Sequence, residues 1–179
     1  MTAITESNTE VPIIRVAKMS TCPSISGLSE LEYHLGYEAE DPQRIHIRLV
    51  RNSGNGKIHP GWLSLADLEH ALASVPADGA FKASILKPLF QGRSTNNLHF
   101  SIAVLLDCGL LKQATPPEEG YVRNVPETLW KELTALIAAG TDLAVPAMEP
   151  SEGDKAGAAN PAAKKSKSVR QRQKSSTPE

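Results

Sequence analysis

Five consecutive polar residues, Arg93 to Asn97, stand immediately before an apolar stretch that is typical of a helix. The run reads RSTNN and supplies a guanidinium, two hydroxyls and two carboxamides. Such groups hydrogen-bond to the polar edges of planar molecules, and hydroxyls beside the free N–H groups of a first helical turn suit anions. Serine, threonine and asparagine are also the residues that cap helices in any protein. The run therefore predicts either a helix cap or a site that contacts polar edges and phosphates.

A second concentration of polar chemistry lies near the C-terminus. Residues 155–174 carry seven Lys or Arg and no Asp or Glu, whereas residues 15–140 carry 12 Lys or Arg against 13 Asp or Glu. Cations on a flexible chain can follow a polyanion without reading its sequence. The candidate contacts are Lys164, Lys165, Lys167, Arg170, Arg172 and Lys174. The alternative is a tail that only increases solubility.

Catalysis and metal binding are not indicated. The two cysteines, Cys22 and Cys108, lie far apart, no CxxC motif occurs, and the five histidines show no ligand spacing with them. The chain contains no GxGxxG, HExxH or GxSxG motif. Cys22 with His34 or His46 would imitate a nucleophile and its base only if the fold placed them together. We predict neither an enzyme nor a bound metal or cofactor.

The elements that must position these residues begin with strands. Apolar side chains alternate with polar ones in two stretches, at Leu31, Tyr33 and Leu35 and again at Ile45, Ile47 and Leu49. Period-two alternation is typical of half-buried strands, and the Asp41-Pro42 pair between them favours a turn. The pattern predicts an antiparallel β-hairpin over residues 30–52.

Helical segments follow, at residues 64–75, 81–90, 94–108 and 126–139. Ser64 is the expected cap of the first, and Pro88 is expected to break the second. In the third, a single buried stripe is expected at Leu98, Ile102, Leu105 and Leu106, and Gly109 stands where a helix-ending glycine belongs. The fourth opens at Pro126 and closes at Gly140.

The residues between the last two helical segments read CGLLKQATPPEEGYVRNV. Leu110 and Leu111 after Gly109 predict a strand, TPPEEG predicts a turn, and residues 121–125 predict a returning strand. Helix, Gly-Leu-Leu, short hairpin, helix is an order that resembles the winged helix-turn-helix domain, in particular the MarR-like regulators. The resemblance covers about residues 64–140.

This resemblance implies that helix 94–108 lies in the DNA major groove. Arg93 would then contact guanine, and Asn96 or Asn97 would contact adenine. Ser94, Thr95, Lys87 and Lys112 would contact phosphates. Readers of this kind usually bind as dimers, so a homodimer is expected, with the hairpin or helix 126–139 as its surface.

The sequence thus predicts an α+β fold with an N-terminal antiparallel β-hairpin, a winged-helix-like helical domain and disordered termini. The predicted boundaries are a loose segment at 1–14, one domain at 15–140 and a disordered basic tail at 141–179. The predicted function is regulatory or architectural binding of double-stranded DNA by a cytoplasmic protein without a membrane segment. The alternative is a protein–protein adaptor with the same fold, or an antagonist that masks another protein's ligand surface.

Overall fold

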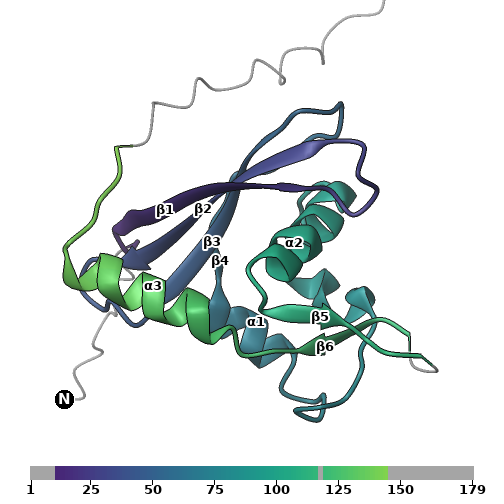
Figure 1. Ribbon diagram of the computed structural model, residues 1–179. Coiled ribbons are helices and arrows are strands. Elements are labelled where there is room, and N and C mark those ends of the chain that lie inside the picture. The colour runs from purple at the N-terminus through teal and green to yellow at the C-terminus, as the bar shows by residue number, and fades with distance from the viewer. Residues whose placement is uncertain (1–10, 117–118, 145–179) are drawn as a thin grey trace, which may run out of the picture. The chain divides into compact units, whose positions relative to one another are not determined.

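The computed structural model describes residues 11–116 and 119–144. They form a mixed α+β structure with a four-stranded antiparallel sheet, a two-stranded sheet and helices (Figure 1). The larger sheet has the strand order β1-β2-β3-β4, with bounds Ile14–Pro23, Glu30–Glu38, Ile45–Asn52 and Leu63–Ser64. The predicted α+β class is therefore confirmed at this level.

The hairpin expected over residues 30–52 is confirmed as β2 and β3. It is part of a four-stranded sheet, whose two outer strands were not predicted from the sequence. The first strand, β1, lacks a regular alternation of polar and apolar residues, because its register shifts between Val16 and Lys18. At this bulge both Val16 and Ala17 are buried, so the polar–apolar alternation is interrupted. The fourth strand, β4, has two residues and is too short to show a period.

One face of the large sheet carries most of the core. Leu31, Tyr33, Leu35 and Tyr37 of β2 are buried there, at alternate positions as a pleated strand requires. The Tyr33 hydroxyl donates a 2.7 Å hydrogen bond to the Asp107 carboxylate, and burial raises the pKa of Tyr33. This bond ties the end of the helix at Thr95–Asp107 to that face of the sheet.

The helices are α1 (Leu65–Ala71), the 3₁₀ helix η1 (Ala83–Phe90), α2 (Thr95–Asp107) and α3 (Glu127–Ala138). Ser64 caps α1 as predicted, since its hydroxyl accepts from the Ala66 N–H group at 3.2 Å. Pro88 does not break the second helical segment, because the segment is a continuous 3₁₀ helix that contains Pro88.

The end of α3 returns the chain to β1. The Leu143 N–H group donates to the Val16 carbonyl oxygen at 2.8 Å, and the Asp142 carboxylate accepts from the Val16 N–H group at 3.3 Å. Residues 141–144, which the sequence assigns to the tail, therefore contact the edge of the sheet. The remainder of the predicted tail, and residues 1–10, lie outside the described residues.

The small sheet consists of β5 (Leu111–Gln113) and β6 (Tyr121–Arg123), close to the expected strands. Phe81 adds to it through a two-bond bridge with Tyr121, at 2.8 and 2.9 Å. Gly120 permits this approach: its φ is +111°, and a Cβ atom there would overlap the Phe81 carbonyl oxygen. The segment before η1 is thereby fixed to β6.

We predict that Gly120→Ala lowers the free energy of unfolding by about 2–4 kcal/mol, measured by urea denaturation. The substitution combines a left-handed φ with the loss of the Phe81–Tyr121 bonds. Gly27→Ala is the matched control, because Gly27 has φ +70° and nothing within 4 Å of the added Cβ, so it should cost about 1 kcal/mol. Equal losses in both variants would contradict the close approach at Gly120.

Candidate functional site

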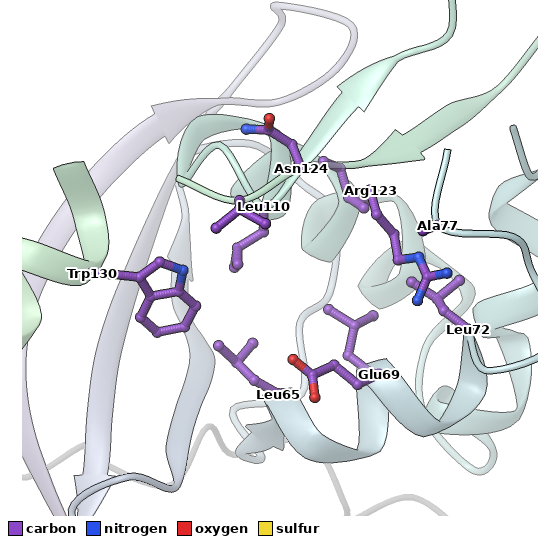
Figure 2. A pocket seen from close by; sticks show the side chains of 11 residues that line it. Leu65, Glu69, Leu72, Ala77, Leu110, Arg123, Asn124 and Trp130 are labelled. Carbon is purple, nitrogen blue, oxygen red and sulfur yellow. The ribbon is translucent and has the colours of Figure 1, made fainter. Parts of the chain in front are cut away.

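A pocket of about 630 Å³ lies where α1, the β5–β6 sheet and α3 meet (Figure 2). This volume is in the range of pockets that bind ligands or anchor side chains. Most of the lining is apolar, and the complete lining is Leu65, Leu68, Glu69, Leu72, Ala77, Leu110, Leu111, Arg123, Asn124, Val125 and Trp130.

Local sequence explains how each element presents its apolar residues. Leu65, Leu68 and Leu72 recur at helical spacing and place one face of α1 against the pocket. Gly109, with φ +70°, ends α2 in a left-handed turn, in which the Leu110 N–H group donates to the Leu105 carbonyl oxygen at 2.9 Å. This turn brings Leu110 and β5 to the pocket wall.

Polar groups occupy defined places in this apolar lining. In Figure 2, Trp130 and Arg123 stand on opposite sides of the pocket, with the Glu69 carboxylate between them. One Arg123 nitrogen, Nη2, donates to the Val75 carbonyl oxygen, whereas the buried Nε has no partner. The Asn124 carboxamide donates to the Gly109 carbonyl oxygen and so connects the chain after β6 to the turn that follows α2. The pocket thus combines apolar surface with one negatively charged side chain, Glu69, and one positively charged side chain, Arg123.

A second hollow, of about 390 Å³, adjoins α3 and is also lined by Trp130. Its other lining residues are Pro42, Gln43, Ile45, Leu133, Thr134, Ile137 and Ala138. Trp130, Thr134 and Ile137 lie on one face of α3, since they are four and three residues apart. The two hollows therefore flank a single half-buried tryptophan.

The residues predicted from the sequence to contact DNA lie elsewhere. Ser94 is the cap of α2, its hydroxyl accepting from the Asn96 N–H group at 3.4 Å. Asn97 is 1% exposed; its Oδ1 accepts from the His59 N–H group and its Nδ2 donates to the His59 carbonyl oxygen, both at 3.0 Å. Arg93 is half-buried beside the same 59–61 segment. Both polar atoms of the Asn97 side chain therefore form hydrogen bonds within the protein.

The burial of α2 also differs from the single stripe that the sequence predicts. Asn97, Ser101 and Val104 line a small gap shared with Ile47 and Leu49 of β3. This second stripe is buried as well, so α2 is covered on two sides. Of the remaining predicted contacts, Asn96 is half-buried, Lys87 and Lys112 are exposed, and Thr95 is the first residue of α2. The six predicted contacts of the basic tail lie outside the described residues.

The nucleophile–base pairing considered for Cys22 is contradicted. Cys22 is buried opposite Leu31 on the inner face of the sheet, whereas His34 of β2 and His46 of β3 both lie on the other face. Burial, with smaller contributions from Asp107, Cys108 and Glu30, raises the pKa of the Cys22 thiol to about 12. A thiol with this pKa is protonated at neutral pH and is a poor nucleophile.

His34 belongs to a polar cluster with Arg48 and Trp62 on the outer face of the sheet. It is 1% exposed, and Arg48 donates to its Nδ1 from Nη2 at 3.1 Å while lying 4.6 Å from the Trp62 ring centroid. Burial first, and the Arg48 charge second, lower the pKa of His34. In the part of the chain that the structure describes, no group of three or more His, Cys, Asp or Glu side chains is arranged to hold a metal ion.

Arg123, Glu69 and Val125 were not identified as functional residues from the sequence, since none of them belongs to an apolar helical stripe or to a known binding motif. Trp130 is the residue with a recognisable signal, because exposed or half-exposed tryptophans often anchor interfaces. The chain matches no family model, no curated protein and no solved structure. Within residues 11–116 and 119–144, no helix has both the length and the apolar character needed to cross a membrane.

We predict that Asn97→Ala destabilises the protein by about 1–3 kcal/mol, because two backbone groups of His59 lose their partner. Urea denaturation measures this loss. Asn96→Ala is the control, since Asn96 is half-buried and its side chain makes no hydrogen bond in the described residues. Equal stability of the two variants would mean that Asn97 does not hold the 59–61 segment.

Proposed function

We propose that the protein is a protein–protein interaction module that binds an apolar segment of a partner in the pocket between α1, the β5–β6 sheet and α3. The observation that carries the proposal is this 630 Å³ apolar pocket with Val125, 74% exposed, in its lining. An open apolar surface of this kind costs free energy in water, and burying it against a partner recovers that energy.

The composition of the pocket supports a protein partner. Interfaces concentrate their binding energy in a few anchors, among which tryptophan and arginine are enriched, surrounded by apolar contacts. Trp130 and Arg123 provide such anchors on the two sides of the pocket, over leucines of α1 and β5. The hollow beyond Trp130 would allow a bound segment to continue along α3.

We further propose that the helical part has a winged-helix-like arrangement. The order α1, Phe81 bridge, η1, α2, β5 and β6 supports this, since it places a two-stranded wing directly after the third helix. In such an arrangement α2 would be the recognition helix. Here its polar stripe packs against the sheet, which favours a role as a protein-binding fold.

We predict that Val125→Asp weakens peptide binding while leaving stability within about 0.5 kcal/mol, because the side chain is exposed and a carboxylate disfavours an apolar contact. The measurement is selection of a random displayed peptide library against the full-length protein, followed by the affinity of the enriched peptides. We expect their affinity for the variant to fall at least about tenfold, which is 1.4 kcal/mol.

Leu28→Asp is the matched control. Leu28 is 88% exposed and lies in the β1–β2 loop, outside the pocket lining, so this variant should bind the enriched peptides as the unmodified protein does. A library that yields no peptides sensitive to Val125→Asp would refute the proposed function.

DNA binding is the second candidate. Residues 79–116 contain Lys82, Lys87, Arg93 and Lys112 against a single acid, Asp107, and the three lysines are exposed. This local excess of positive charge, together with the six basic tail residues, favours a polyanion. A homodimer, regulatory DNA binding and a cytoplasmic location stay predictions.

We predict that any duplex binding is nonspecific and depends on these cations. Fluorescence anisotropy with a random-sequence duplex, at several salt concentrations, should give a slope of log affinity against log salt that falls by about 0.9 for each phosphate contact removed. Glutamine replacements at Lys82, Lys87 and Lys112 are compared with glutamine replacements at the six tail positions. A full-length protein that does not bind the duplex at low salt would exclude this candidate.

A further inference from the structure

We propose that the segment bound in the pocket carries an Asp or Glu side chain next to its apolar anchor, and that Arg123 determines this preference by binding the carboxylate. The proposal rests on the proposed function and specifies the chemistry of the partner. Its occupant is an internal acidic–apolar segment of another protein.

The Arg123 guanidinium has hydrogen-bond donors without an acceptor. Nη2 is fixed by the Val75 carbonyl oxygen, the Nε–H group is buried without an acceptor, and Nη1 makes no hydrogen bond within the described residues. Among the residues that the structure describes, no carboxylate lies within ion-pair distance of Arg123. A charged donor held in place without an acid favours a carboxylate brought by a partner, because arginine binds carboxylates through charge-assisted hydrogen bonds.

The charge of Arg123 lies in a pocket whose lining is mostly apolar. Arg123 lies at the end of β6, beside Ala77 and Leu72, so a carboxylate bound there would have apolar walls beside it. Water is partly excluded from such a place, and a charge pair is stronger there than at an open surface. The apolar neighbour of the acid would contact the leucines and Trp130.

Glu69 supplies the direction of binding. It is exposed, it lines the same pocket, and it lies between Arg123 and Trp130 in Figure 2. A second acid placed near Glu69 would be repelled, whereas an uncharged or basic residue would be accepted. The bound segment therefore has its acid toward Arg123 and non-acidic residues from Glu69 past Trp130.

The same charges argue against a nucleic acid in this pocket. A phosphate backbone presents a negative charge at every nucleotide, and Glu69 would oppose the charges next to the one bound by Arg123. It also has no aliphatic side chains to fill a pocket lined by leucines. A single carboxylate beside an apolar side chain satisfies both the charge and the volume.

The test is selection of a random peptide library against the full-length protein, with the peptides fused at their C-termini so that carboxylates come only from side chains. We expect enrichment of Asp or Glu within a few residues of a large apolar residue. Replacing that acid by its amide in an enriched peptide should weaken binding at least about tenfold, measured by fluorescence polarisation.

Arg123→Gln is the matching change in the protein. This variant should bind the acidic peptide more weakly than the unmodified protein does, by the same factor of about ten. Its affinity for the amide peptide should equal that of the unmodified protein. Arg123→Lys keeps the charge without the planar fork and should bind with intermediate affinity. Glu69→Gln removes the other charge of the pocket and should bind the acidic peptide at least as well as the unmodified protein does. The comparison of the acidic and the amide peptide uses the unmodified protein. A loss of stability in an Arg123 variant would therefore not affect the conclusion.

Two outcomes separate this proposal from the one on which it rests. Enriched peptides that depend on Val125 but show no acidic preference would overturn the role of Arg123 and leave the binding function intact. Peptides with an acid whose replacement has no effect would overturn it equally. Failure to enrich any peptide that depends on Val125 would overturn both.

Discussion

The packing of α2 between two layers is the constraint on which the rest of the structure depends. Asn97, Ser101 and Val104 face β3, and the stripe of Leu98, Ile102 and Leu105 lies about 100° further around the helix. Small and polar residues on the sheet side allow the helix to approach closely, and the Asn97 carboxamide satisfies the backbone of the 59–61 segment that would otherwise lose hydrogen bonds to water. Both polar atoms of the Asn97 side chain are therefore used within the fold.

This arrangement moves the accessible chemistry to another part of the molecule. With both sides of α2 covered, an apolar pocket is open where α1, the small sheet and α3 converge. Gly109 turns the chain sharply after α2 and brings Leu110 to the pocket lining, and Gly120 lets Phe81 lie against β6. Both glycines have left-handed backbone angles that other residues adopt only with strain.

The large sheet has two faces of different character. The inner face is built from leucines, isoleucines and tyrosines that pack on helices, whereas the outer face holds Arg48 between His34 and the Trp62 ring. Neutral His34 is consistent with its role as an acceptor from Arg48, because a second positive charge there would be repelled. The outer face therefore carries a polar cluster in which the buried Nε2 of His34 has no hydrogen-bond partner, and the thiols on the inner side are buried.

The sequence by itself determined the elements whose signals are local. Alternation placed β2 and β3, helical spacing with Ser64, Ser94 and Gly109 placed α1 and α2, and Gly-Leu-Leu followed by a turn placed β5 and β6. It did not reveal β1, because a bulge interrupts the alternation, or the continuity of η1 through Pro88. Only the tertiary structure decided which face of α2 is covered and where the pocket lies. A polar stripe such as Asn97 and Ser101 has the same sequence pattern whether it faces water, a ligand or a sheet, and the pocket brings together residues from 65 to 130.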